Sequence, residues 1–191
     1  PFAPSLRLLM QEASDAQLEA PDAADLAMIA ETGGTTGKPK RVMLSNHNLE
    51  CMSALMLMNF PFVGRPVYLA LAPLTHSAGI FCLPMLALGG CIIIMAKPDL
   101  VEFMCLIPLR RITHTFLPPV LLERLLQFEQ LAATDLSSLQ CFWYGGEPIA
   151  APLLEQALHT IGPVMGQVFG QTEVPMAIST MAPQDHFNSD G

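Results

Sequence analysis

The sequence of 191 residues has few basic side chains. Nine lysines and arginines stand against 17 aspartates and glutamates, which gives a net charge of −8. This balance argues against nucleic acid or an anionic membrane surface as the main partner. Three of the basic residues, Lys38, Lys40 and Arg41, nevertheless stand almost side by side. A local basic cluster on an acidic chain is typical of a site that binds a polyanion.

The cysteines form no C-x-x-C pair, and their number is odd. This argues against a disulfide framework or a zinc site. Because all five stand in apolar stretches, we expect buried, reduced thiols in a cytoplasmic protein. They are Cys51, Cys82, Cys91, Cys105 and Cys141. No basic-then-apolar leader opens the sequence, and because it begins with Pro1 rather than Met, we expect a piece of a longer protein.

The sequence contains no long apolar run without an interruption. Residues Ser77 to Ala96 carry no charge and have nearly the length that crosses a bilayer. Pro84 and a Gly-Gly pair interrupt them. We therefore expect a packed helix over Ala78 to Leu88 and a buried strand over Cys91 to Met95, and no transmembrane span.

Apolar residues make up 51% of the sequence, enough for the core of one domain. Short apolar runs alternate with segments of helical period. This pattern predicts a single α/β unit over residues 1–191, with a largely parallel sheet flanked by helices. Strands are expected at 26–30, 42–44, 67–71, 91–95, 112–117, 141–144 and 164–169, and helices at 6–20, 46–60, 78–88, 100–109, 119–127 and 151–160. Residues 26–30 are expected to be buried, and residues 182–191 to form a loop.

The most distinctive stretch runs from Glu31 to Val42 and combines glycines, threonines and basic residues. Glycines let backbone N–H groups turn toward an anion, and hydroxyls and cations add donors and charge. These residue types predict a phosphate-holding loop. The loop G-x-x-x-x-G-K-[ST] of common phosphotransferases fails at Thr32 and Pro39, and no G-x-G-x-x-G is present. A plain Gly/Thr turn is the simpler alternative.

This stretch resembles the signature [ST]-[SG]-G-[ST]-[ST]-G-x-P-K-G of the adenylate-forming (AMP-binding) superfamily, which includes the acyl-CoA synthetases. The matching residues are Thr32, Gly33, Gly34, Thr35, Thr36, Gly37, Pro39 and Lys40. Arg41 departs from the pattern, since the family usually has glycine there. The resemblance implies that the loop binds the phosphates of ATP, with Lys40 on the leaving pyrophosphate.

Further segments follow expected strands, where ligands of open α/β sheets bind. The segment Ala72 to Gly79 resembles L-P-L-F-H-x-x-G, with Thr75 in place of the aromatic residue. The resemblance implies that His76 lies near the acyl and thiol channel; a capping or core histidine is the alternative. The segment Tyr144 to Ile149 is similar to G-G-[AE]-P-[LI]. That similarity implies that the adenine lies along Gly146, Glu147 and Pro148.

The segment Val168 to Glu173 is similar to the family's [YF]-G-x-T-E. The resemblance implies that Phe169 and Gly170 contact the adenine. It implies further that Thr172 binds the α-phosphate and that Glu173 is a ligand of Mg²⁺.

Four further histidines receive no predicted functional role. Asn46 stands where a family segment L-[ST]-H-x-N-L has histidine, so His47 inherits no role. His114, His159 and His186 match no motif, and we expect surface or satisfied histidines.

The resemblance implies an acid–thiol ligase. Such an enzyme converts a fatty or aryl acid and ATP to an acyl-adenylate and pyrophosphate, and then passes the acyl group to coenzyme A. The matched motifs cover the central part of the family's large domain. They leave out its start, its ribose-binding aspartate and its small C-terminal domain. We therefore expect the 191-residue chain to be inactive alone and prone to self-association. Arg41 and Asn46 suit a rival, a non-catalytic homologue that binds a nucleotide or an acyl group.

Overall fold

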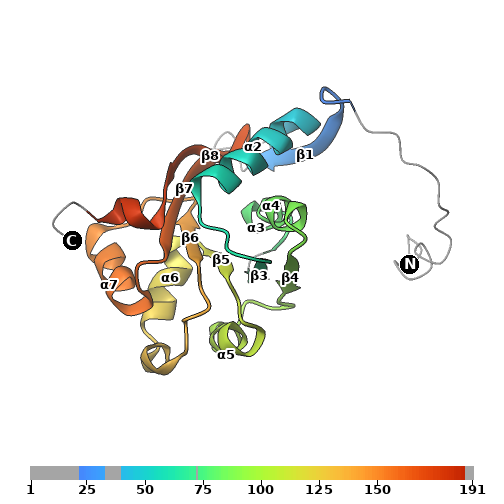
Figure 1. The fold of residues 1–191 in the computed structure, drawn as a ribbon. Helices are drawn as coiled ribbons and strands as arrows, with labels where there is room; N and C mark the ends of the chain where they lie inside the picture. The colour runs from blue at the N-terminus through green and yellow to red at the C-terminus, as the bar shows by residue number, and fades with distance from the viewer. Residues whose placement is uncertain (1–21, 33–39, 72, 188–191) are drawn as a thin grey trace.

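The computed structural model describes residues 22–32, 40–71 and 73–187. Its centre is a six-stranded sheet with the strand order β4-β3-β5-β6-β7-β8 (Figure 1). The strands are β3 (Val67–Ala70), β4 (Cys91–Ile94), β5 (His114–Leu117), β6 (Cys141–Gly145), β7 (Met165–Gln171) and β8 (Val174–Met181). All neighbours pair in parallel except β7 and β8, which form an antiparallel hairpin. The expected α/β class with a largely parallel sheet is confirmed.

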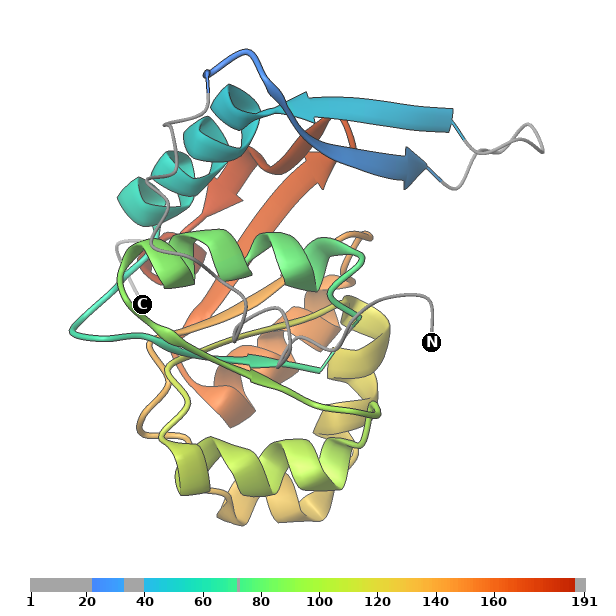
Figure 2. The same ribbon diagram turned by 90° about the vertical axis from the view of Figure 1, so that its right-hand side faces the viewer.

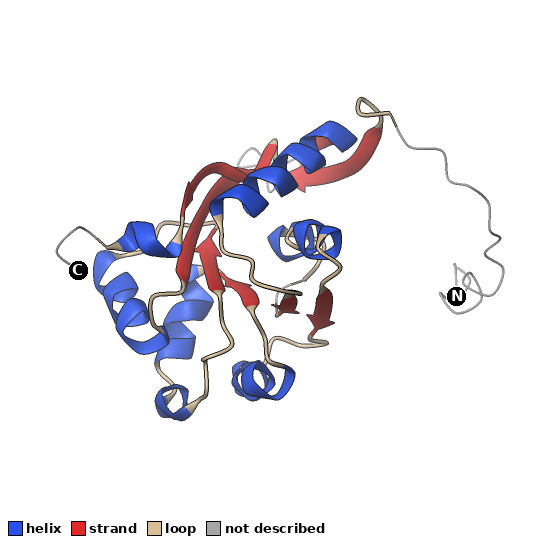
Figure 3. Ribbon diagram, viewed as in Figure 1, coloured by secondary structure: helices blue, strands red, loops and turns tan. Residues whose placement is uncertain are grey.

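Helices cover both faces of this sheet (Figure 3). One face carries α2 (Asn46–Asn59), α3 (Ser77–Ile80) and α4 (Cys82–Ala87). The other carries α5 (Leu100–Arg110), α6 (Pro119–Leu126) and α7 (Ala151–Ile161). The described residues also form two short 3₁₀ helices, η1 (Glu129–Ala133) and η2 (Pro183–His186). The expectation of a loop over residues 182–191 is therefore wrong at η2.

Strand β6 shows how the sequence builds a core on each face. Successive strand residues point to opposite sides of a sheet. Cys141 and Trp143 accordingly pack with Phe81 and with buried residues of α2 and α4, whereas Phe142 and Tyr144 pack with those of α5, α6 and α7. Because both faces are covered, the strand reads as one continuous apolar run.

A separate two-stranded sheet leads into and out of the Gly/Thr stretch. Strands β1 (Leu26–Thr32) and β2 (Lys40–Ser45) pair antiparallel, and their hairpin lies at the periphery (Figure 2). Residues 26–30 form a strand, as expected, but their expected burial is wrong. Leu26 and Ile29 are 53% and 54% exposed because no described element packs over them.

The expected helix over residues 78–88 is two helices, α3 and α4, which meet at Phe81. Pro84 lacks the N–H that a continuous helix would direct to the carbonyl of Ile80, so the hydrogen-bond ladder breaks there. These short helices and strand β4 account for the uncharged stretch. No described helix is long and apolar enough to cross a bilayer.

Strand β4 lies at the edge of the sheet. It is only partly buried, whereas a buried strand was expected. Ile94 is 59% exposed, while Met95, just after the strand, is buried. The burial expected for the cysteines is also wrong in part. All five are free thiols, as expected, but only Cys82 and Cys141 are buried. Apolar neighbours in sequence did not distinguish an edge strand or an outer helix face from the core.

His114 is a satisfied core histidine, as expected. Its Nε2 lies 2.9 Å from the carbonyl of Pro61, its Nδ1 lies 2.7 Å from Thr113 Oγ1, and Phe62 stacks on the ring. Because Nε2 faces a carbonyl, it carries the proton. Burial disfavours the charged form and lowers the pKa of His114 from 6.5 to about 4.

This histidine makes the free energy of unfolding depend on pH. Between pH 6.5 and about 4 the unfolded chain takes up a proton that the folded chain excludes, so stability falls as the pH falls through this window. The difference corresponds to about 3 kcal/mol. Urea unfolding between pH 7 and 4 is expected to show a flatter pH dependence for His114→Asn than for the unmodified chain. Equal slopes would contradict this assignment.

Candidate functional site

Three of four adjacent parallel strands carry the downstream predicted motifs toward one edge of the sheet. β3, β5, β6 and β7 run side by side in parallel, so their carboxyl ends lie together. The segments that contain His76 and Gly146 follow the ends of β3 and β6, and Phe169 lies in the last part of β7. Between β3 and β5 the strand order reverses, because β4 follows β3 on one side and β5 lies on the other. Such a switch point is where open α/β sheets bind ligands.

The G-G-E-P turn and the F-G-Q-T-E segment leave neighbouring strands. Gly145 pairs with Val168, so Gly146 and Phe169 follow at the next step. Gly146 has φ = +86°, and no atom lies within 4 Å of the position of an added Cβ. Glycine is thus favoured there by backbone conformation, and the space beside it is open. A flat ring can approach such a backbone closely.

Glu147 uses its side chain structurally. Its Oε1 accepts the backbone N–H of Val120 at 3.0 Å, in the first turn of α6. A carboxylate there satisfies one of the unpaired N–H groups and complements the helix dipole. Pro148 follows in the turn and is exposed.

Removal of this carboxylate tests its capping role. Glu147→Ala is expected to lower the free energy of unfolding by about 1 kcal/mol, the usual loss for an N-terminal helix cap. Glu147→Gln keeps an acceptor oxygen and should lose less. Urea unfolding of both variants measures the difference; equal stability of Glu147→Ala and the unmodified chain would remove the role.

Thr172 and Glu173 form the two-residue turn between β7 and β8. The register pairs Gln171 with Val174, so the side chains of this turn stand at the tip of a hairpin. Thr172 is half-buried, and Glu173 is exposed. Phe169 is 53% exposed and offers a free ring face. An added Cβ on Gly170 would lie 2.3 Å from the backbone nitrogen of Met176, so the partner strand β8 leaves room only for glycine at this position.

His76 is exposed and stands at the N-cap position of α3, but its side chain makes no cap hydrogen bond. It is therefore neither of the structural alternatives, a capping or a core histidine. Its Nδ1 lies 2.9 Å from Thr75 Oγ1. The threonine that replaces an aromatic residue of the family pattern thus holds the ring by one edge. In the described part of the chain, the other ring nitrogen, Nε2, has no hydrogen-bond partner.

Thr32 and Lys40 pair at the end of the β1–β2 hairpin. Gly33, Gly34, Thr35, Thr36 and Gly37 lie outside the described residues, as do Lys38 and Pro39. Arg41 pairs with Glu31 across the two strands, and its Nε lies 3.3 Å from Glu31 Oε1. Because neighbouring strand residues point to opposite faces, Arg41 and Lys40 do not face the same ligand. Arg41, where the family usually has glycine, therefore links the two strands of the β1–β2 hairpin.

Asn46 and His47 anchor the start of α2. The side chain of Asn46 donates to the carbonyl of Asp22 at 2.9 Å, and the backbone N–H of His47 donates to Ala23 at 2.9 Å. Asn46 thus has a structural partner at the position where the family pattern has histidine. The two remaining histidines agree with expectation: His159 is exposed, and His186 is hydrogen-bonded to Tyr144 Oη and to the carbonyl of Ala182.

A family model described as AMP-binding enzyme matches residues 3–191. The chain belongs to the AMP-binding enzyme family. It is 37% identical over 155 residues to the medium/long-chain-fatty-acid–CoA ligase FadD8 of Mycobacterium tuberculosis, covering 81% of this chain and 27% of that protein. It is 31% identical over 174 residues to a feruloyl-CoA synthase of Amycolatopsis, covering 88% and 35%. The chain thus spans about a third or less of the length of these relatives.

Solved structures of adenylate-forming enzymes share the fold of this AMP-binding chain. The o-succinylbenzoate CoA synthetase MenE of Bacillus subtilis superimposes with a TM-score of 0.81 at 26% identity, covering 93% of this chain and 37% of that one. ATP-bound MatB of Rhodopseudomonas palustris gives a TM-score of 0.79 at 29% identity, covering 90% and 34%. The resemblance stated from the motifs is therefore confirmed at the level of family and fold.

The donor set of this AMP-binding chain suits Mg²⁺ held with a nucleotide. The described residues contain no cluster of three or more His, Cys, Asp or Glu side chains that could hold a metal. Mg²⁺ usually keeps several waters and binds one or two carboxylates together with substrate phosphates. The exposed carboxylate of Glu173, next to the Thr172 hydroxyl, fits that mode.

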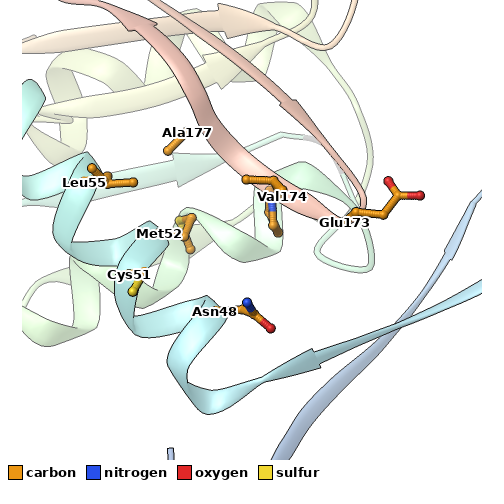
Figure 4. Close-up of a pocket in the computed structure, with 8 residues that line it drawn as sticks. Asn48, Cys51, Met52, Leu55, Glu173, Val174 and Ala177 are labelled. Carbon is orange, nitrogen blue, oxygen red and sulfur yellow. The ribbon is translucent and has the colours of Figure 1, made fainter. Parts of the chain in front are cut away.

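A narrow groove of about 100 Å³ runs from the hairpin tip along α2 (Figure 4). Glu173 and Val174 line it from the hairpin, and Asn48, Cys51 and Leu55 line it from α2. Sequence reasoning missed these α2 residues. Asn48 lies in the segment similar to L-[ST]-H-x-N-L but was given no role, no motif contains Cys51 or Leu55, and the groove joins residues more than a hundred positions apart. A wider depression lined by Leu100, Arg124, Gln127 and Phe128 contains none of the motif residues.

Proposed function

We propose that the chain is a central piece of the large domain of an AMP-forming acid–thiol ligase. The parent protein activates a carboxylic acid with ATP to an acyl-adenylate, releases pyrophosphate, and passes the acyl group to coenzyme A. One observation carries this proposal. The carboxyl ends of adjacent parallel strands gather the three downstream family motifs on one edge of the sheet.

The proposed roles follow from position and residue type. Residues 32–37 and Lys40 bind the β- and γ-phosphates. The open backbone at Gly146 and Pro148, with the exposed ring of Phe169, accepts the adenine. A carboxylate attacks the α-phosphorus slowly unless charge is neutralised and the groups are held in line. Thr172 supplies a hydroxyl for the α-phosphate.

Glu173 would hold Mg²⁺, which supplies the charge neutralisation that ATP chemistry needs when it is bound. His76 is proposed at the acyl and thiol side, because it follows β3, which β5 and β6 separate from β7. Thr75 orients its ring through Nδ1. We propose a fatty or aryl acid as the substrate. The support is the two relatives, which are named for a medium- or long-chain fatty acid and for feruloyl-CoA.

Product analysis of the parent protein tests this proposal. With ATP, Mg²⁺, coenzyme A and a panel of fatty, aryl and amino acids, we expect acid-dependent formation of AMP and pyrophosphate. Formation of ADP and phosphate would point instead to a phosphotransferase. ATP binding without turnover for any acid would favour a non-catalytic homologue.

The 191-residue chain alone is proposed to bind ATP weakly and not to turn it over. The proposed contacts hold the nucleotide from the phosphate and adenine sides only. Pyrophosphate release by the purified chain at a rate on the order of 1 s⁻¹, typical of enzymes, would contradict this.

A further inference from the structure

Cys51 and His47 form a thiol–imidazole pair on the exposed face of α2. They are four residues apart, which places their side chains on neighbouring turns of one helix face. Cys51 Sγ lies 3.5 Å from His47 Nε2 and 3.7 Å from Nδ1. Both side chains are exposed. The adenylation site proposed above uses neither residue.

This geometry provides a proton acceptor in either tautomer of the imidazole. A neutral imidazole carries one protonated and one unprotonated nitrogen. Because both nitrogens of His47 lie within 3.7 Å of the sulfur, an unprotonated nitrogen is near Sγ whichever tautomer is present. The thiolate is the reactive form of cysteine, so a nearby base favours attack.

The thiol also lies on the groove that ends at Glu173 (Figure 4). Met52, Leu55, Val174 and Ala177 make the walls largely apolar. A groove of about 100 Å³ has room for a substituent of a few heavy atoms. Its apolar walls favour uncharged groups over carboxylates or phosphates. Nucleophile, base and binding space therefore coincide at one place.

We propose that Cys51 is a thiol-modification site that forms a mixed disulfide with a small, uncharged organic disulfide. His47 takes the proton of the Cys51 thiol, and Sγ attacks one sulfur of the disulfide R–S–S–R. The Cys51–S bond forms as the S–S bond of the reagent breaks. The leaving thiolate R–S⁻ takes the proton from His47 and departs as R–SH. One Cys51 thiol is oxidised and one reagent sulfur is reduced, so no further oxidant is needed.

The other cysteines of the chain are matched controls. Cys91 and Cys105 are exposed like Cys51, and neither contacts an imidazole in the part of the chain that the structure describes. Cys82 and Cys141 are buried, and burial raises the pKa of both thiols. Exposure alone thus predicts three equally reactive thiols, whereas the pair with His47 predicts one fast thiol.

The test treats the reduced chain with bis(2-hydroxyethyl) disulfide, an uncharged reagent, and follows each cysteine by peptide mass spectrometry over time. We expect Cys51 to react about tenfold faster than Cys91 or Cys105, a modest share of what a positioned base supplies. His47→Ala and His47→Gln should lower the rate at Cys51 to that of Cys105. Both variants keep the backbone hydrogen bond to Ala23. In 8 M urea, a roughly standard denaturing concentration, the difference between the thiols should vanish.

Equal rates at the three exposed thiols of the folded chain would overturn the proposal. An unchanged Cys51 rate in both His47 variants, with melting curves that show a folded chain, would overturn it too. A fast Cys51 that persists in urea would assign the effect to local sequence rather than to this geometry. None of these readouts depends on ATP turnover, so the inference and the proposed ligase function fail separately.

Discussion

Replacement of Lys40 by alanine in the parent protein is expected to lower kcat for adenylate formation by on the order of 10²–10³-fold, equivalent to about 2.7–4 kcal/mol. The physical reason is the charge that develops on the leaving pyrophosphate. A cation held at the end of the hairpin stabilises that charge most in the transition state. The measurement is steady-state kinetics with ATP as the varied substrate.

The neighbouring cation supplies a matched control. Arg41 lies one position further along β2, on the opposite face, in an exposed ion pair with Glu31. Such a pair contributes at most about 1 kcal/mol to stability. Arg41→Ala should therefore leave kcat nearly unchanged. Equal losses in the two variants would mean that general basicity of the loop matters, and an unaffected Lys40→Ala would reject the assigned role.

Replacement of Trp143 by alanine should lower the free energy of unfolding by about 3–5 kcal/mol, the usual loss when a large core aromatic is truncated. Trp143 is fully buried on β6, with ring centroids 4.7 Å from Phe81 and 5.6 Å from Phe60. Domain stabilities are commonly 5–15 kcal/mol. The variant should therefore lie near the edge of folding.

Two control variants accompany Trp143→Ala, one at the same position and one on the surface. The indole Nε1 has no hydrogen-bond partner in the described part of the chain, so Trp143→Phe loses volume but no hydrogen bond. It should cost clearly less than the alanine variant. Met58→Ala, at a residue that is 80% exposed, should cost little. Urea unfolding followed by far-ultraviolet circular dichroism measures all three; a loss below about 1 kcal/mol for Trp143→Ala would contradict the packing described.

The central sheet could be predicted from sequence because buried parallel strands have a strong signature. Runs such as residues 141–144 are continuously apolar and alternate with helical segments. Strand β8 was missed for the opposite reason. Its sequence mixes polar and apolar residues, contains Pro175, and follows a Thr-Glu turn without the Gly or Asn that marks most tight hairpins.

Burial was harder to predict than secondary structure. Leu26 to Ala30 was correctly expected to be a strand, but whether another element covers it depends on the rest of the fold. The same holds for Cys51, Cys91 and Cys105, which lie on an outer helix face or an edge strand. Local sequence carries no information on such neighbours.

The order of the site motifs along the chain was predictable from the sequence, but the contacts of their side chains were not. The motifs named the segments, and the parallel sheet explains why three of them lie at one edge. The hydrogen bond from the Val120 N–H to Glu147 and the groove between α2 and Glu173 are long-range contacts. No motif encodes them or the pairing of Arg41 with Glu31.

The central claim is that the carboxyl ends of β6 and β7, together with Lys40, form one nucleotide site. Titration of the ¹⁵N-labelled chain with MgATP, followed by amide NMR, tests it most directly. Saturable amide shifts are predicted at residues 146, 147, 169–173 and 40. The amides at the opposite edge of the sheet, at residues 112–113, 138–140, 162 and 164, should not shift. Lys40→Ala should weaken the binding. An absence of shifts at the first set, or shifts of equal size at both edges, would contradict the account.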